Sequence, residues 1–190
     1  ISIWASFGPK TQQFGKLAEK NLLLPIETWP QSGLSHLWPP RMDYPSGVKV
    51  YDAYSPVARQ IYWDHLKRLF DYGIDAWWMD STDPDFFNAT KENYEQKGAM
   101  GSWRSVRNLF PLATVKGIYE KQRKASEEKR VFIMTRSAFA GQQHYGSGLW
   151  SGDVASTWDM LRKQVPAGLN YTMTGCPNFN TDIGGFFCGS

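Results

Sequence analysis

Carboxylates stand at the ends of several short apolar runs in this chain. Asp80 follows the run Ile74 to Met79, and Asp153 and Asp182 each stand where a strand would meet its loop. Two carboxylates on one face suit glycosidic bond cleavage, because one can act as nucleophile while the other protonates the leaving oxygen and later activates water. The retaining route needs a carboxyl separation of roughly 5–5.5 Å and the inverting route roughly 6.5–9.5 Å, a distance that the sequence does not supply.

Each of these residues also has a simpler explanation. An aspartate after a strand is often a turn former or a helix N-cap, which fits Asp83 and Asp85 and would also fit Asp182. Arg136, which ends the run Val131 to Thr135, could be a structural ion-pair partner. The coincidence of three strand-end aspartates with one strand-end arginine, and with tryptophan beside two of the aspartates, favours a reaction site.

Strands and helices alternate along the sequence, and this alternation would bring the strand ends together. The expected strands lie at Ile1 to Phe7, Ile74 to Met79, Val131 to Thr135 and Asn170 to Thr174. The expected helices begin near Thr11, Ser55-Pro56, Trp103 and Ser156, where Asp159 would complete a capping box. The long segment from Thr28 to Ser55, rich in Pro, Gly and aromatic residues, is interpreted as a rim of the site or an inserted hairpin.

Strands separated by helices indicate parallel pairing and an α/β fold. We count about four or five βα units, whereas a closed (β/α)8 TIM barrel needs eight, so residues 1–190 are expected to be the middle of one barrel domain with both ends absent. A doubly wound open sheet is the competing architecture. It is disfavoured because no Gly-rich phosphate loop follows any expected strand.

Composition narrows the class of partner. Nine Trp, nine Tyr and eleven Phe provide flat faces that could stack on sugar rings, although Trp77, Trp78 and Trp150 could equally be core residues. The net charge is +3 with scattered Lys and Arg, so no nucleic-acid partner is expected, and no apolar run is long enough to span a membrane.

The histidines and cysteines do not indicate a metal site or another cofactor. His36, His65 and His144 are too scattered to form a metal site with Cys176 and Cys188. The two cysteines could form a disulfide bridge or remain free thiols. We therefore expect neither a metal nor a cofactor.

Four motifs occur in the order and spacing of glycoside hydrolase family 31, which the chain resembles over essentially its whole length. They are Trp78-Met79-Asp80-Ser81-Thr82-Asp83-Pro84, Arg136-Ser137-Ala138-Phe139-Ala140-Gly141, Trp150-Ser151-Gly152-Asp153 and Thr181-Asp182-Ile183-Gly184-Gly185-Phe186. The resemblance implies a (β/α)8 barrel and an enzyme that acts on α-glucosides, α-xylosides or related substrates.

The resemblance also implies roles for single residues. Asp80 would be the nucleophile of a retaining double displacement and Asp153 the general acid/base. Arg136 and Asp182 would bind or support the sugar, and its walls would be the aromatic residues Trp38, Trp78, Trp150 and Phe186. A guanidinium would keep Asp80 ionised, while an apolar wall and the neighbouring negative charge would keep Asp153 protonated.

Departures from the family pattern are visible too. The family often has Glu where this chain has Asp83, and it takes an Asp from an early strand and a His from the last strand, both outside this chain. The stretches Glu27 to Gly33 and Trp38 to Arg41 look most like bacterial α-xylosidases that trim xyloglucan, which implies a periplasmic or surface-attached enzyme. The alternatives are an α-glucosidase of the same family and an inactive or sugar-binding fragment. The sequence does not indicate the oligomeric state.

Overall fold

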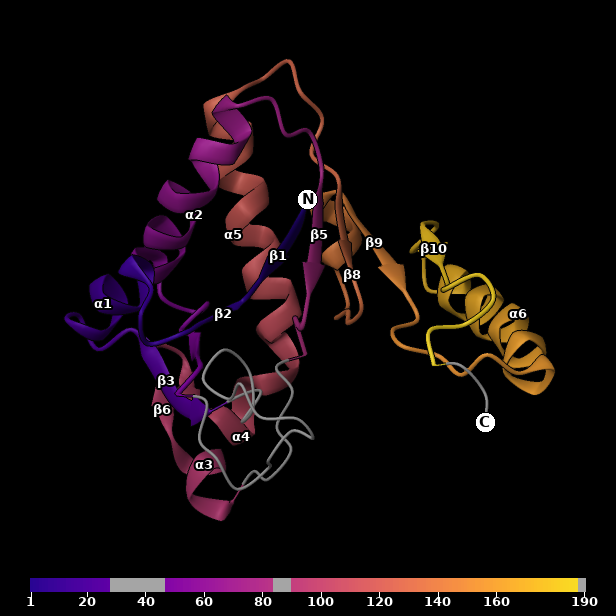
Figure 1. Cartoon of the computed structure of the whole chain (residues 1–190), viewed down its shortest axis with the longest axis horizontal. Helices are drawn as coiled ribbons and strands as arrows, with labels where there is room; N and C mark the ends of the chain where they lie inside the picture. The colour runs from indigo at the N-terminus through magenta and orange to yellow at the C-terminus, as the bar shows by residue number, and fades with distance from the viewer. Residues whose placement is uncertain (28–46, 84–89, 188–190) are drawn as a thin grey trace.

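A parallel sheet forms the centre of the computed structural model, which describes residues 1–27, 47–83 and 90–187. Its five strands follow the order β1-β5-β8-β9-β10. They are β1 (Ser2–Trp4), β5 (Trp77–Asp80), β8 (Ile133–Thr135), β9 (Ser147–Trp150) and β10 (Phe179–Asn180). Every pairing between these strands is parallel, so their C-terminal ends point to the same edge of the sheet (Figure 1). The predicted parallel α/β architecture is confirmed.

Two long helices, α2 (Pro56–Asp71) and α5 (Phe110–Ala125), pack side by side and cover one face of the sheet (Figure 1). The start of α2 matches the prediction, because the side chain of Ser55 accepts a hydrogen bond from the Ala58 amide. Gly73 follows the end of α2 with a left-handed φ of 101°, a conformation that residues with a β-carbon adopt only with strain. These end signals fix where the chain turns back towards β5.

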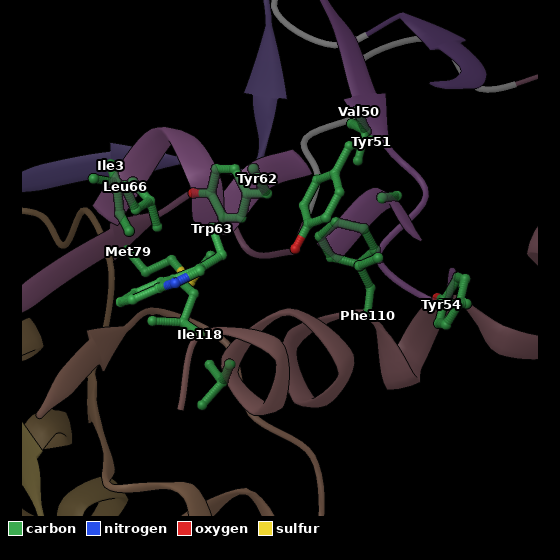
Figure 2. Close-up of a cluster of buried hydrophobic side chains, with 14 of the residues drawn as sticks. Ile3, Val50, Tyr51, Tyr54, Tyr62, Trp63, Leu66, Met79, Phe110 and Ile118 are labelled. Carbon is green, nitrogen blue, oxygen red and sulfur yellow. The ribbon is translucent and has the colours of Figure 1, made fainter. Parts of the chain in front are cut away.

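Aromatic side chains fill the core between these helices and the strands. Tyr51 packs at a tilt on Tyr62, with ring centroids 4.7 Å apart, and Phe110 meets Tyr51 edge-on at 6.1 Å (Figure 2). The tyrosine hydroxyls find partners inside the core, since Tyr62 donates to the Trp4 carbonyl and Tyr54 to the Val106 carbonyl. Burial raises the pKa of all three tyrosines, so they stay neutral.

Strand β5 divides its side chains between two environments. Trp77 and Met79 are fully buried in the core, and the Trp77 indole donates a 2.8 Å hydrogen bond to Gln122 of α5. The alternate residues Trp78 and Asp80 point to the opposite face, where Trp78 keeps 44% of its surface exposed. In a barrel that opposite face is the interior, so the period of two places Asp80 there.

A second, antiparallel sheet stands beside the first, in the order β2-β4-β3. It consists of β2 (Ser6–Phe7), β3 (Leu23–Glu27) and β4 (Lys49–Tyr51), with α1 (Gln12–Ala18) between β2 and β3. The single strand predicted over Ile1 to Phe7 is therefore two strands, which part at Ala5 to serve different sheets. Strand β4 lies within the segment Thr28 to Ser55, and residues 28–46 lie outside the described residues, so its interpretation as a rim of the site or an inserted hairpin stays a prediction.

The connection from β5 to α5 contains several short elements. It contains α3 (Lys91–Glu95), β6 (Lys97–Gly98), β7 (Gly101–Ser102), α4 (Trp103–Val106) and the 3-10 helix η1 (Arg107–Leu109). The predicted helix start at Trp103 is confirmed by α4, and the longer helix α5 follows after η1. The connection from β8 to β9 carries only the 3-10 helix η2 (Gln142–Tyr145).

Two predictions about the C-terminal part were wrong. Helix α6 (Trp158–Met173) is capped by Thr157, whose hydroxyl accepts from the Met160 amide, and not by Ser156. The segment Asn170 to Thr174, predicted as a strand, is helical except for the C-cap Thr174, because Gly168 lets α6 pack closely on Phe179 of β10. Within the last turn, the hydroxyl of Thr172 donates to the Leu169 carbonyl. The strand at this position in the fold is β10.

Candidate active site

Four of the predicted site residues lie at one edge of the sheet. Asp80 is the last residue of β5, Arg136 follows β8 directly, and Asp153 and Asp182 lie in the loops after β9 and β10. Because the four strands are consecutive neighbours and parallel, their ends deliver these side chains to the same edge. The structure thus brings together residues that are far apart in the sequence.

Arg136 lies between two carboxylates. Its Nε is 3.6 Å from Oδ1 of Asp80 and 3.0 Å from Oδ1 of Asp83. Its Nη2 lies 3.4 Å from the hydroxyl oxygen of Ser81. The guanidinium side chain is only 11% exposed, so water screens these interactions weakly. Asp83, for which a turn role was considered, is therefore also an ion-pair partner.

Asp80 is held in a sharp turn at the end of its strand. Ser81 has a left-handed φ of 50°, and its backbone amide donates a 2.7 Å hydrogen bond to Oδ1 of Asp80. Burial raises the pKa of Asp80, and it outweighs the lowering by the Ser81 amide and by Arg136. We predicted that a guanidinium would favour the ionised carboxylate; Arg136 acts in that direction, but the net shift of the Asp80 pKa is upward.

Asp153 links the two other acidic residues electrostatically. Burial is the main cause that raises the pKa of Asp182, and the negative charge of Asp153 is the second cause. The charge of Asp153 also raises the pKa of Asp80. The Asp153 carboxyl therefore lies within electrostatic range of both. Asp153 itself is exposed, so the described residues do not provide the apolar wall predicted around it.

The loops after β9 and β10 are joined through their backbones. The amides of Phe186 and Phe187 donate to the Val154 carbonyl at 2.7 and 3.1 Å, and the Ser156 amide donates to the Phe187 carbonyl at 2.8 Å. A β-carbon on Gly185 would lie 2.5 Å from Cα of Ser156, so only glycine permits this approach. This contact fixes Asp182 and Phe186 relative to the loop of Asp153.

The aromatic residues predicted to contact the sugar differ in exposure. Trp78 and Trp150 meet edge to face with ring centroids 5.5 Å apart, but Trp150 is only 3% exposed while Trp78 is 44% exposed. Phe186 is exposed and packs edge-on against Phe187. Trp38 lies outside the described residues. Trp78 and Phe186 are thus the ones that offer open aromatic surface.

A buried polar network behind Arg136 was not foreseen. Gln142 is 1% exposed; its amide donates to the Ser137 carbonyl at 3.1 Å, and its oxygen accepts from the Phe139 amide at 3.3 Å. The hydroxyls of Thr82 and Ser137 lie 2.6 Å apart and join the loops after β5 and β8. No spacing signal marks this network, because its members are common polar residues in loops.

A cavity of about 360 Å³ opens beside Asp182, lined also by Ser156, Trp158, Gln164 and Gly185. Its described lining includes neither Asp80 nor Asp153, so the cavity lies next to these two carboxylates without enclosing them. Within residues 1–27, 47–83 and 90–187, no three His, Cys, Asp or Glu side chains are grouped to hold a metal ion. No helix in the same residues is long and apolar enough to cross a membrane.

Comparisons with known proteins agree with this geometry. The model of the TIM-barrel domain of glycosyl hydrolases family 31 matches residues 1–190. An α-xylosidase of Saccharolobus solfataricus is 35% identical over 196 residues, covering 100% of this chain and 23% of the relative. An uncharacterized family 31 glucosidase of Pseudescherichia vulneris is 33% identical over 187 residues, which cover 98% of this chain and 33% of the relative.

Solved structures lead to the same group of enzymes. A family 31 α-xylosidase from Xanthomonas citri matches with a TM-score of 0.85 and 34% identity, over 100% of this chain and 20% of that chain. An α-xylosidase from a soil metagenome, complexed with xylose, matches with a TM-score of 0.80 and 31% identity, over 97% and 26%. The chain thus spans between a fifth and a third of the length of these relatives. It belongs to glycosyl hydrolase family 31 and forms part of that family's TIM-barrel domain.

Proposed function

We propose that the whole protein is a retaining glycoside hydrolase that releases terminal α-xylosyl residues from oligosaccharides by double displacement. One observation carries the proposal: Asp80 and Asp153 lie within electrostatic range of each other at the strand-end edge that also holds Arg136. Residues 1–190 would contribute the central part of a single catalytic barrel domain. The relatives described as α-xylosidases support xylose as the sugar released.

In the first step, the Asp80 carboxylate attacks the anomeric carbon while the bond from that carbon to the leaving oxygen breaks. Asp153 gives its proton to that oxygen, so the leaving group departs as a neutral alcohol. The sugar is then bound to Asp80 through an ester. Since attack needs an ionised carboxylate, Arg136 at 3.6 Å opposes the effect of burial on Asp80.

In the second step, Asp153 takes a proton from a water molecule, whose oxygen attacks the anomeric carbon. The ester bond breaks, the sugar leaves with its original configuration, and Asp80 returns as a carboxylate. The positive charge of Arg136 stabilises that carboxylate as a leaving group. Asp153 regains its proton and is ready for the next cycle.

The remaining predicted residues would bind the sugar. Asp182 can accept hydrogen bonds from sugar hydroxyls, and the exposed faces of Trp78 and Phe186 can contact the apolar faces of the ring. Trp150 supports Trp78 from behind through their edge-to-face contact. We include Trp38 on family resemblance alone.

Xylose is glucose without its hydroxymethyl group, so an aromatic residue that fills this space would exclude glucose. The test is a rate comparison of the whole protein on an aryl α-xyloside and the matching aryl α-glucoside. A higher kcat/KM on the xyloside supports the proposal. Preference for the glucoside would make the protein an α-glucosidase, an alternative that the glucosidase relative supports, and would leave the residue roles intact.

We propose that the substrates are xyloglucan oligosaccharides. The enzyme would be bacterial and would trim the side chains of these oligosaccharides. A sugar-binding protein without turnover is the second candidate, because Trp78 and Phe186 leave aromatic surface open. Calorimetry with xylo-oligosaccharides beside a turnover assay separates the two, since binding of these sugars without hydrolysis of any α-xyloside would favour the binding protein.

A further inference from the structure

Arg136 lies closer to Asp83 than to the proposed nucleophile, Asp80. Its Nε donates to Oδ1 of Asp83 at 3.0 Å, while Oδ1 of Asp80 is 3.6 Å away. The longer distance lies outside the usual range for a hydrogen bond, whereas the shorter one lies within it. Asp83 therefore accepts a hydrogen bond from the guanidinium, whereas Asp80 interacts mainly with its charge.

The backbone on both sides of this ion pair is held by buried hydrogen bonds. Thr82, next to Asp83, is fully buried and its hydroxyl lies 2.6 Å from that of Ser137, next to Arg136. The side-chain amide of Gln142 donates a 3.1 Å hydrogen bond to the Ser137 carbonyl. These bonds hold the backbone segments that carry Asp83 and Arg136 next to each other.

We propose that Asp83 is a positioning residue for the reaction: it accepts the hydrogen bond from Arg136 and so holds the guanidinium beside Asp80. The inference rests on the proposed function, because it presumes that Asp80 is the nucleophile. A role in the turn alone would need no partner after β8, yet the Asp83 carboxylate accepts a hydrogen bond from Arg136, which is 53 positions away.

Four groups act on the charge of Asp80 from the elements around it. Burial of the Asp80 carboxyl itself raises its pKa most, and the carboxylates of Asp153, from the loop after β9, and of Asp83, from its own loop, raise it further. Arg136, from the loop after β8, and the Ser81 amide lower it. Removing the charge of Asp83 therefore lowers the pKa of Asp80.

Three substitutions of Asp83 separate positioning from a structural role. Asp83→Asn keeps an oxygen that can accept from Arg136 but removes the charge, so the acid limb of the kcat/KM profile should move to lower pH. Asp83→Ala removes the acceptor as well, and kcat should fall by about 10²-fold as the guanidinium loses its orientation. Asp83→Glu keeps a carboxylate and should restore most of the Asp83→Ala loss.

A matched control lies at the other end of the same strand. Asp75 precedes β5 and pairs with Lys129 at 2.7 Å, so Asp75→Asn also removes a carboxylate from an ion pair. This variant should keep the kcat and the acid limb of the unsubstituted protein. Thermal unfolding of all four variants shows whether a loss of activity follows from unfolding.

Labelling of Asp80 distinguishes a failure of this inference from a failure of the proposed function. A fluorinated xylosyl fluoride that forms a slowly hydrolysed ester should label Asp80 in the whole protein, as detected by mass spectrometry of its peptides. A label on another residue, or none, would overturn the function and the inference with it. A label on Asp80 together with an unmoved acid limb in Asp83→Asn, or full kcat in Asp83→Ala, would overturn the positioning role alone.

Discussion

Ion pairs join the β5 segment to the β8 segment at both ends of the strands. At the N-terminal ends, Lys129 meets Asp75 at 2.7 Å, with side chains 43% and 75% exposed. At the C-terminal ends, Arg136 meets Asp83 at 3.0 Å and Asp80 at 3.6 Å, with its side chain 11% exposed. The exposed pair is the closer one, yet water screens it and its contribution to stability is small.

The difference between the two ends lies in burial and surroundings rather than in distance. At the C-terminal edge, Asp153 adds negative charge and the turn at Ser81 holds Asp80 in place. The low exposure of Arg136 and Asp80 strengthens the interaction between them, and parallel strands bring further loops to the same edge. The N-terminal edge also pairs a basic with an acidic side chain, Lys129 with Asp75, but it lacks these additions, so we assign it a structural role.

The largest predicted difference between the two ends concerns Asp80. Asp80→Ala should lower kcat on an aryl α-xyloside by roughly 10⁴-fold or more, because no other group can form the ester with the sugar. Asp75→Ala, the matched change at the other end of β5, should leave kcat unchanged. Substantial residual turnover in Asp80→Ala, measured with the whole protein, would remove Asp80 from the nucleophile role.

Asp153→Ala should have the next largest effect, and its size should depend on the substrate. With a poor leaving group, the first step should slow by about 10²- to 10⁴-fold, because the leaving oxygen receives no proton. With a nitrophenyl leaving group, which needs little protonation, the first step should stay near its normal rate. Pre-steady-state kinetics on the two substrates provides the measurement; equal losses on both would argue against Asp153 as the acid.

Much of the scaffold could be predicted from local signals. The cap at Ser55, the stop at Gly73 and the apolar run before Asp80 depend on neighbouring residues only, so the sequence reveals them. The pairing of Arg136 with Asp83 could not be predicted, because it depends on how two distant strands lie side by side. The family motifs identified Asp80 and Asp153 as candidate catalytic residues, but they gave no sign that the side-chain amide of Gln142 is buried and hydrogen-bonded.

The same limit explains the errors near the C-terminus. Asn170 to Thr174 contains Tyr171, Thr172 and Thr174, residue types that favour strands, and the local pattern therefore predicts a strand there. The helix continues because Gly168 lets it pack closely on Phe179 of β10, where a β-carbon would come within 2.7 Å of the ring. Packing against a strand further along the chain overrides local propensity.

Two adjacent glycines test how the reaction edge is held together. Gly184 and Gly185 both have φ of 87°, but a β-carbon at Gly184 would meet open space while one at Gly185 would collide with the backbone of Ser156. Gly185→Ala should therefore lower kcat/KM by about 10²-fold through displacement of Asp182. Gly184→Ala, which carries the same backbone strain without the collision, should lose far less; equal losses would show that the contact is unimportant.

Gln142 tests whether the network behind Arg136 matters for its position. Gln142→Leu removes three hydrogen-bonding contacts in a buried site, which should lower the free energy of unfolding by about 1–3 kcal/mol. We also expect kcat to fall by roughly tenfold, since Arg136 lies next to the freed Ser137. The adjacent and exposed Gln143→Leu is the control and should change neither quantity in chemical denaturation and rate measurements.

The smallest expected effect belongs to the exposed pair at the N-terminal ends. Asp75→Asn should change the free energy of unfolding by only about 0.2–1 kcal/mol, because both partners already interact with water. High salt should reduce even this difference, since it screens the attraction between Lys129 and Asp75. Urea unfolding of the whole protein at low and high ionic strength measures it. A loss of several kcal/mol, or a shifted pH profile, would mean that the two ends of β5 are not as different as their exposure indicates.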